Sequence, residues 1–306
     1  MASGILILDK TAGVTSFDAV AVVRRRLGIR RVGHAGTLDP GATGVLPILV
    51  GEATKLVSWL VDQDKEYVAT IRFGVTTDTH DLTGRVLAEA PVPTLTRSAL
   101  EEACRPFVGR IQQTPPMYSA VHHAGRRLYE LAREGIEVPR EPREVVVHSI
   151  RVEDVGEAAV TLRVRCGKGT YVRVLAADLG KVFGCGAAIE RLVRARVGPF
   201  ALEIAVGWDA LTEGPVDALW ARMLPPESAL AGWAGVNLDA GAARRFTHGQ
   251  PVEIAPPSAR AGTPVRVHDA TTGVLLGVGE VTPGAGGVKP LRLLNADRPG
   301  TRVLPA

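Results

Sequence analysis

Residues 33–44 read GHAGTLDPGATG, and this stretch decides how the first part of the chain is interpreted. Its glycines and its proline would destabilise a helix or a strand, so the stretch is predicted to be a loop. Asp39 stands directly before Pro40. An aspartate at such a position is usually a turn residue, and composition alone gives Asp39 no other role.

The segments around this loop predict a mixture of strands and helices. Residues 4–8 (GILIL) form a short apolar run, and residues 65–74 alternate, with Tyr67, Ala69, Ile71 and Phe73 on one face, so both are predicted strands. Thr15 and Asp18 stand three apart before AVAVVRRRL, which is a capping-box pattern at the start of a helix. Further predicted elements are helices at 96–108 (with Ser98 and Glu101 as a cap pair), 126–134 and 172–184, and strands at 144–152 and 159–166.

These elements do not alternate steadily between strand and helix. The pattern therefore favours an α+β domain with a mixed sheet and flanking helices over a doubly wound sheet. Residues 214–232 contain Gly and Pro and read as a linker with a short helix inside it. From residue 235 the chain is rich in Gly, Pro and Val in short β-like pieces, which predicts a small all-β domain. The expected domains are 1–232, including the linker, and 235–306.

Charge and composition limit the partners and the compartment. The net charge is only +4, but residues 1–31 hold the cations Lys10, Arg24, Arg25, Arg26, Arg30 and Arg31 against two aspartates. Such a cluster can follow a phosphate backbone, and the ordinary alternative is a solvated helix face. Three widely spaced cysteines, the lack of a secretory signal and the lack of a long apolar run predict a cytoplasmic protein without a membrane segment. No strong apolar stripe is evident, so a monomer is expected.

Several common site signatures are missing from the sequence. No GxxxxGK[ST], GxGxxG or GxSxG pattern occurs, so neither a nucleotide-binding loop nor a hydrolase nucleophile is supported. The histidines and cysteines do not stand at metal-ligand spacing, and no metal site is expected.

The loop and its surroundings resemble one enzyme family. Residues 33–47 are similar to the catalytic loop of the TruB family, the tRNA pseudouridine 55 synthases, whose pattern is GHxGTLDPxATGVLP. Matching motifs follow in the family's order: LDK (8–10), GEATKL (51–56), DKEY (64–67), TPPMYSAV (114–121), GRRLYELAREG (125–135), CGKGTYVR (166–173) and RLVRARVGPF (191–200). The resemblance covers about residues 4–200. Two departures are His122, where the family often has lysine, and Asp81-Leu82-Thr83, where it often has acidic residues.

The resemblance implies a role for individual residues. Asp39 is expected to be the catalytic carboxylate, Arg173 its ion-pair partner and Tyr67 a stacking residue for the target base. The other expected substrate contacts are His34, which would stack in RNA opened by base flipping, Tyr171 as a pocket wall, Thr37 and Leu38 in the loop, and Lys10 and Lys55 at phosphates. Ordinary structural roles are the alternatives: a core tyrosine for Tyr67, a loop-capping histidine for His34 and a surface arginine for Arg173.

The implied reaction is isomerisation of uridine 55 in the T arm of tRNA to pseudouridine, by aspartate-dependent cleavage and re-formation of the glycosidic bond after base flipping. This reaction needs no redox change and no net group transfer, so no cofactor is expected. The resemblance also implies a PUA-like RNA-binding domain at 235–306. One alternative is a tRNA-folding chaperone that mainly binds, and another is a synthase for a different RNA. A structural protein of an RNA–protein particle would carry long basic tails, which this chain lacks.

Overall fold

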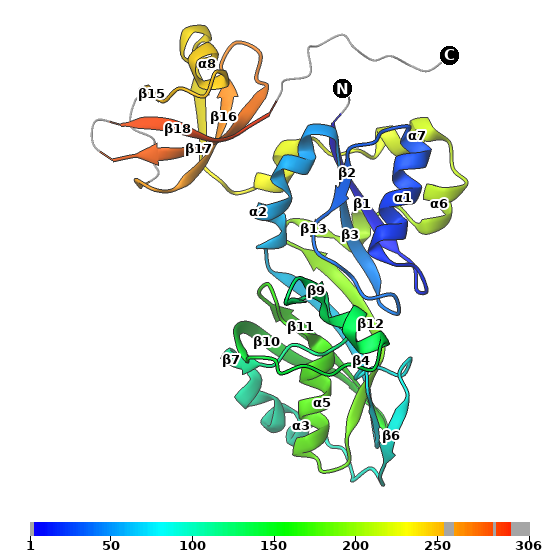
Figure 1. Ribbon diagram of the computed structural model, residues 1–306. Coiled ribbons are helices and arrows are strands. Elements are labelled where there is room, and N and C mark those ends of the chain that lie inside the picture. The colour runs from blue at the N-terminus through cyan, green and yellow to red at the C-terminus, as the bar shows by residue number, and fades with distance from the viewer. Residues whose placement is uncertain (1–2, 254–259, 284–285, 295–306) are drawn as a thin grey trace.

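One mixed sheet forms the centre of the molecule. The computed structural model describes residues 3–253, 260–283 and 286–294. Over this part of the chain, nine strands pair in the order β1-β3-β12-β4-β11-β10-β7, with β2 beside β3 and β13 beside β12 (Figure 1). The strands are β1 (Gly4–Lys10), β2 (Val32–His34), β3 (Thr43–Val50), β4 (Lys65–Phe73), β7 (Gly109–Gln113), β10 (Arg143–Val155), β11 (Ala159–Cys166), β12 (Ala187–Val197) and β13 (Phe200–Ala201). The predicted α+β fold with a mixed sheet is confirmed.

The two halves of this sheet meet at β3 and β12. That pair is parallel, with Val193 opposite Thr43 and Arg194 opposite Gly44, whereas the other strand pairs described in this sheet are antiparallel. The loop between β2 and β3 carries Asp39, so the catalytic candidate lies where the two halves join (Figure 1).

The N-terminal half is built on β1 and α1 (Ser16–Leu27). The GILIL run of β1 is buried on both faces because it lies between packed layers. The predicted capping box is confirmed: the amide of Asp18 donates to the Thr15 hydroxyl, and the Asp18 carboxylate accepts from the Thr15 amide. Gly28 ends the helix in the left-handed conformation, at φ 66°, where glycine carries no Cβ penalty. This half also contains the 3-10 turn η1 (Gly51–Leu56) and α2 (Val57–Val61).

The other half packs α3 (Arg97–Cys104) and α5 (Val172–Val182) against β4, β11 and β12. The alternation predicted for β4 is confirmed, since Ala69, Ile71 and Phe73 are buried in this core. Smaller elements complete the half: β5 (Val75–Thr77), β6 (Val86–Glu89), η2 (Arg105–Phe107), β8 (His122–His123), β9 (Arg126–Arg127) and α4 (Leu128–Arg133).

The segment expected as a linker packs on the N-terminal half, which contains β1. After η3 (Leu202–Ile204) and α6 (Trp208–Thr212), it forms α7 (Val216–Ala221) and η4 (Pro226–Leu230). Leu224 pairs with Ile5 at the edge of β1, and Ala229 and Leu230 are buried in the core beside it. The predicted short helix is present. The segment as a whole is not a free linker, because its apolar side chains are buried in the core of the N-terminal half.

The C-terminal unit is a five-stranded sheet in the order β14-β16-β17-β18-β15, within the described residues. Its strands are β14 (Gly235–Leu238), β15 (Val252–Glu253), β16 (Pro264–Asp269), β17 (Leu275–Thr282) and β18 (Gly287–Leu293). The predicted β domain is confirmed, and it also contains α8 (Ala240–Thr247), capped by Asp239, which the sequence interpretation omitted. Residues 295–306 of the predicted domain lie outside the described residues.

Three predicted boundaries are wrong. The predicted loop is shorter at both ends, because His34 lies in β2 and Thr43 begins β3. His34 pairs with Ile48, and Gly44 pairs with Lys10. The cap of α3 is Thr96, whose hydroxyl accepts from the Ala99 amide, and Ser98 caps nothing. Residues 126 and 127 form β9 before α4 begins at Leu128.

Candidate active site

The centre of the candidate site is an ion pair between Asp39 and Arg173. The Arg173 Nε lies 2.8 Å from Asp39 Oδ2. Asp39 comes from the loop after β2, and Arg173 from the first turn of α5. The arginine side chain is 5% exposed, whereas the aspartate side chain is 37% exposed. The carboxylate is therefore open to a ligand on one side and held by a buried cation on the other.

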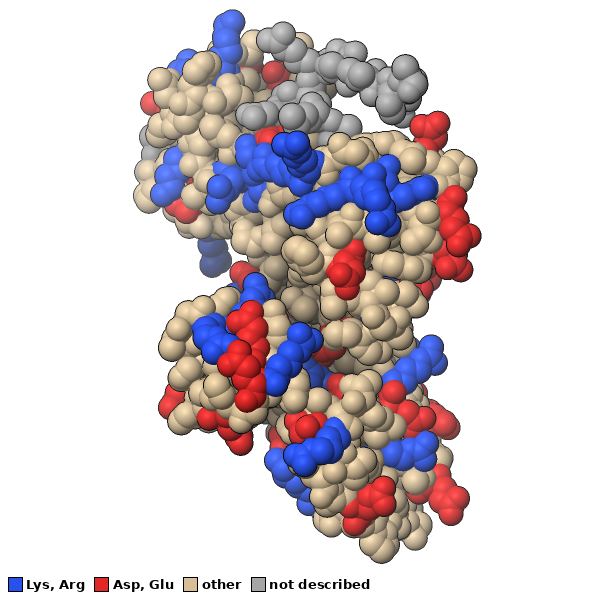
Figure 2. Space-filling model, turned by 45° about the vertical axis from the view of Figure 1, so that its right-hand side comes forward, with Lys and Arg blue, Asp and Glu red and all other residues tan. Residues whose placement is uncertain are grey.

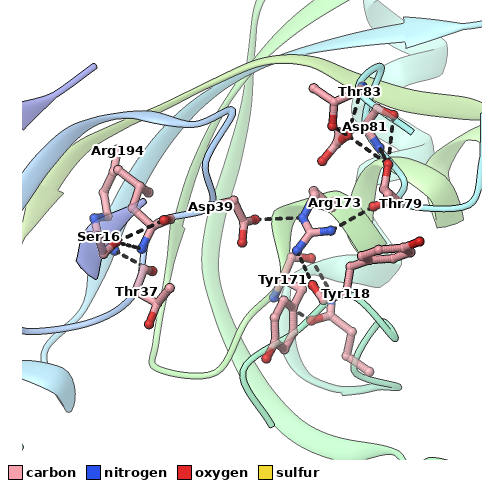
Figure 3. A network of polar contacts seen from close by, with 12 residues as sticks. Ser16, Thr37, Asp39, Thr79, Asp81, Thr83, Tyr118, Tyr171, Arg173 and Arg194 are labelled. Atoms are coloured by element: carbon pink, nitrogen blue, oxygen red, sulfur yellow. Dashed lines mark hydrogen bonds and ion pairs between the residues drawn. The ribbon is translucent and has the colours of Figure 1, made fainter. Parts of the chain in front are cut away.

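The other nitrogens of Arg173 bind backbone carbonyls. Nη1 donates to the carbonyl of Thr79 at 2.8 Å, and Nη2 donates to the carbonyl of Tyr118 at 2.9 Å (Figure 3). Nε meets the Asp39 carboxylate as a close ion pair. Because the three contacts point in different directions, the guanidinium is fixed and cannot follow a moving carboxylate.

The first turn of α5 is held by a buried glutamine. Gln113 is 4% exposed, and its amide nitrogen donates to the Tyr171 carbonyl at 3.1 Å while its amide oxygen accepts from the Tyr171 amide at 2.8 Å. Tyr171 is the residue just before α5, so this pair of bonds sets the direction from which Arg173 enters the site.

A buried serine holds the loop at the residue before Asp39. The Ser16 hydroxyl donates to the Leu38 carbonyl at 3.0 Å and accepts from the Leu38 amide at 2.8 Å. Ser16 is 3% exposed and is the first residue of α1. Both polar groups of the Leu38 backbone are thus satisfied away from water, which restricts the chain as it reaches Asp39.

Replacing Ser16 with Ala is expected to lower the free energy of unfolding by about 1–3 kcal/mol, because the buried amide and carbonyl of Leu38 lose their partner. Chemical denaturation of both proteins measures the difference. Ser98→Ala is the matched control, since Ser98 is an exposed serine in the first turn of α3 without a side-chain hydrogen bond among the described residues, and its change should stay within about 0.5 kcal/mol. Equal changes for the two variants would contradict the expectation.

Lys10 supports the loop from within. Its ammonium donates to the carbonyls of Thr11, Val14 and Pro40 at 2.8, 2.8 and 3.2 Å, and the residue is fully buried. Burial lowers the pKa of Lys10 to about 8, Asp39 opposes this shift and Arg194 adds to it. The expected phosphate contact is therefore replaced by a bond to the residue after Asp39, because the ammonium is enclosed.

The two tyrosines predicted for the site border it. Burial raises the pKa of Tyr67, although the side chain keeps partial exposure, and the charge of Asp39 raises it further while Arg194 lowers it. Burial also raises the pKa of Tyr171, and Asp39 again adds to the shift. Both phenols thus lie within electrostatic range of Asp39 and are uncharged at neutral pH.

His34 lies at the end of β2 and is half-buried. Burial lowers the pKa of His34, and the cations Arg194 and Arg127 lower it further. Arg127 belongs to β9, so the insertion between β7 and β10 comes close to the start of the loop. A neutral imidazole at this place suits a stacking contact.

The remaining predicted contacts separate into three kinds. Thr37 is exposed beside Asp39 and is available to a ligand. The Leu38 side chain is 3% exposed and lies in the core under β4, so it offers the ligand little surface. Lys55 lies away from the site: its ammonium contacts Glu52 at 2.6 Å and the Leu293 carbonyl of β18 at 2.8 Å, which connects the C-terminal unit to the N-terminal half.

The sequence interpretation missed the supporting residues Ser16, Gln113 and Arg194. Arg194 is 1% exposed on β12 and binds the carbonyls of Gly36, Thr37 and Val45. One signal was available: Leu192 and Arg194 stand two apart in the motif at 191–200, so in a strand they share a face, and the leucine marks that face as buried.

A separate cavity of about 550 Å³ lies between Trp59, Trp233 and the start of β4. None of the predicted site residues lines it. Over the described residues, no group of three or more His, Cys, Asp or Glu side chains could hold a metal ion. No described helix is both long enough and apolar enough to cross a membrane.

Comparisons with known proteins agree on one family. Residues 24–172 match the model described as TruB family pseudouridylate synthase (N terminal domain), and residues 234–294 match Pseudouridine synthase II TruB, C-terminal. The chain is 45% identical to tRNA pseudouridine synthase B of Pseudomonas aeruginosa, over 96% of both chains. It is 43% identical to the protein of the same name from Chromohalobacter salexigens, over 95% of this chain and 94% of that one.

The solved structures show the fold. A chain in the structure of an H/ACA RNP bound to a substrate RNA containing 2′-deoxyuridine superposes with a TM-score of 0.71 at 23% identity, over 95% of this chain and 84% of that one.

Proposed function

Because the chain belongs to the TruB family of pseudouridine synthases, we propose that it isomerises uridine 55 in the T arm of tRNA, with Asp39 as the catalytic carboxylate. The chain is a tRNA pseudouridine synthase, an isomerase. The observation that carries the proposal is the half-exposed Asp39 carboxylate 2.8 Å from the buried Arg173 guanidinium.

The reaction sets definite demands on these groups. The bond from C1′ to N1 breaks, the uracil turns, a bond from C1′ to C5 forms, C5 loses its proton and N1 gains one. Asp39 has three alternative tasks: attack on C1′, attack on the base, or removal of a sugar proton. Each needs a carboxylate with a fixed direction, and the ion pair with Arg173 fixes that direction.

Access to the uridine requires base flipping, which costs a few kcal/mol of unstacking. Tyr67 offers an aromatic face on β4 for the flipped base, and His34 offers a flat neutral ring to the space left in the RNA. Thr37 and Tyr171 complete the proposed contacts beside Asp39. Lys10 is assigned to the loop and not to phosphate.

Cations on the surface fit a phosphate backbone. Figure 2 shows Lys and Arg side chains gathered in a band across the upper half of the molecule. Arg25, in the last turn of α1, and Arg30, just after the helix, are exposed and have no ion-pair partner among the described residues. Phosphate contacts of this kind give affinity and salt dependence, while the arm's shape gives specificity.

The remaining features of the proposal stay predictions. They are a PUA-like RNA-binding role for the C-terminal unit, the domain boundaries at 1–232 and 235–306, a cytoplasmic location, a monomer, and catalysis without a cofactor. Arg298 and Arg302, which belong to the predicted RNA-binding domain, lie outside the described residues.

The direct test is incubation of the full-length chain with an unmodified tRNA transcript, without metal or added cofactor, followed by pseudouridine mapping. Product at the T-arm uridine is expected, and a transcript with cytidine at that position should give none. Product at another site only would reassign the substrate. Binding of the transcript without product would favour the chaperone alternative.

Deprotonation of Lys10 is expected to change the isomerisation rate and the free energy of unfolding in opposite directions. Its pKa is about 8 in the folded protein against 10.5 in the unfolded chain, so between these values the unfolded chain binds more protons and this group makes stability rise with pH. Over the same range the ammonium that binds the Pro40 carbonyl is lost, and the isomerisation rate is expected to fall. Single-turnover rates and denaturant unfolding across this range measure both.

Lys65 supplies the control for that prediction. Burial lowers its pKa to about 8 as well, but its ammonium binds the carbonyls of Val61 and Gln63, away from the loop. Lys10→Gln should remove the alkaline fall in rate, whereas Lys65→Gln should keep it. An alkaline fall that survives in Lys10→Gln would refute the assignment.

A further inference from the structure

Arg194 is a buried cation without an acidic partner. It is 1% exposed in the middle of β12, and no carboxylate among the described residues forms an ion pair with it. Burial of an unpaired charge is costly unless hydrogen bonds satisfy it. This buried charge lies beside the loop that carries Asp39, and its hydrogen bonds are made to that loop and to the strand that follows it.

The guanidinium holds both ends of the loop that carries Asp39. Its Nη2 and Nη1 donate to the carbonyls of Gly36 and Thr37 at 3.1 and 3.3 Å, where the loop begins. Its Nε donates to the Val45 carbonyl at 2.7 Å, just after the loop has entered β3. In Figure 3, Arg194 lies with Thr37 on one side of Asp39, and Arg173 lies on the other.

The backbone of Arg194 also contacts the loop. Gly44 lies opposite Arg194 in the parallel pair of β3 and β12. A Cβ on Gly44 would stand 2.3 Å from the Arg194 carbonyl oxygen and 2.9 Å from its nitrogen, and Gly44 has a φ of 101°. Glycine is required there for both reasons, so the end of the loop lies directly against the Arg194 backbone.

Arg194 further joins the loop to the strand of Tyr67, because it is the register partner of Tyr67 in the pair of β12 and β4. The same residue is thus fixed to three neighbours of the reaction centre: the start of the loop, its end, and the strand that offers the stacking tyrosine.

We propose that Arg194 is a positioning residue, whose three-way fork sets the loop so that Asp39 meets Arg173 and faces the base on Tyr67. The inference rests on the proposed catalytic role of Asp39. It predicts that the shape of the side chain is required as well as its charge, since a lysine ammonium is a point donor and cannot span carbonyls at both ends of the loop.

The test compares Arg194→Lys with the parent chain in single-turnover isomerisation of an unmodified tRNA transcript, alongside the Kd for that transcript. The rate is expected to fall about 10- to 100-fold, the effect of a small misplacement of a catalytic group, while the Kd stays near the parent value. Arg191→Lys is the matched control, because Arg191 is exposed on the same strand and its side chain makes no hydrogen bond or ion pair among the described residues. It should keep the parent rate.

A second variant distinguishes the loss of positioning from simple unfolding. Arg194→Ala leaves a space shaped for guanidinium, so millimolar guanidinium ion should restore part of its rate and ammonium ion should not. Parent rate in Arg194→Lys, or equal loss of rate and of tRNA binding with no guanidinium rescue, would overturn the inference. Asp39→Asn is measured in the same assay: if it keeps the parent rate, the proposed catalytic role of Asp39 fails and the positioning role fails with it, whereas an inactive Asp39→Asn beside a fully active Arg194→Lys refutes the positioning role alone.

Discussion

Asp39→Asn is expected to lower the rate of pseudouridine formation by at least about 10⁴-fold, a loss typical of removing the central group of a catalytic unit. The amide keeps the size of the side chain and its place beside Arg173, but it has no negative charge and is a poor nucleophile and base. All three alternative tasks of the carboxylate fail together, so the prediction does not depend on which one operates.

Binding should survive this change. The variant should stay folded, because Asp39 is 37% exposed and Arg173 keeps its bonds to Thr79 and Tyr118. The free energy of unfolding is expected to fall by about 1–2 kcal/mol, less than for a fully buried pair. The measurement is single-turnover pseudouridine mapping with saturating enzyme, together with the Kd for the transcript.

Asp154→Asn provides the control for charge, because Asp154 is an exposed aspartate on β10 whose side chain has no hydrogen bond or ion pair among the described residues. It should leave the rate unchanged. Retained activity in Asp39→Asn would make Asp39 a turn residue, which is what composition alone suggested.

The sequence predicted the parts of this molecule that depend on local pattern. The apolar run of β1, the Thr15–Asp18 capping box and the alternation of β4 each follow from periodicity or cap chemistry, and the structure has all three. The pairing of Asp39 with Arg173 came from the family resemblance. No local rule joins a loop after β2 to the first turn of α5, since their contact depends on the sheet topology.

The errors arose where tertiary structure changes the meaning of a residue. Lys10 ends a strand, where lysine is usually solvated, yet the loop folds over it and its ammonium binds three carbonyls. Lys55 was expected at a phosphate and instead contacts β18, in a unit far away along the chain. Helix α8 lies among β-like pieces and is too short for periodicity to reveal, although Asp239 is an N-cap signal that could have been used.

Arg173→Lys is expected to lower the rate by about 10²- to 10³-fold, comparable to the loss of one fixed electrostatic donor at a reaction centre. Lysine keeps the positive charge but not the fork. The guanidinium meets Asp39, the Thr79 carbonyl and the Tyr118 carbonyl through three nitrogens, and a single ammonium cannot reach partners on three separate segments.

The pattern of variants separates charge from geometry at Arg173. If only the charge were needed, Arg173→Lys would keep most of the rate and Arg173→Met would lose it; we expect both to lose it, with the methionine variant slower.

Arg163→Lys is the control, because Arg163 also bridges two partners, Glu66 and Glu153, but on the exposed face of β11 where water can replace a lost contact. Its rate should stay at the parent value. A fully active Arg173→Lys would mean that the carboxylate needs a nearby cation and not a fixed direction.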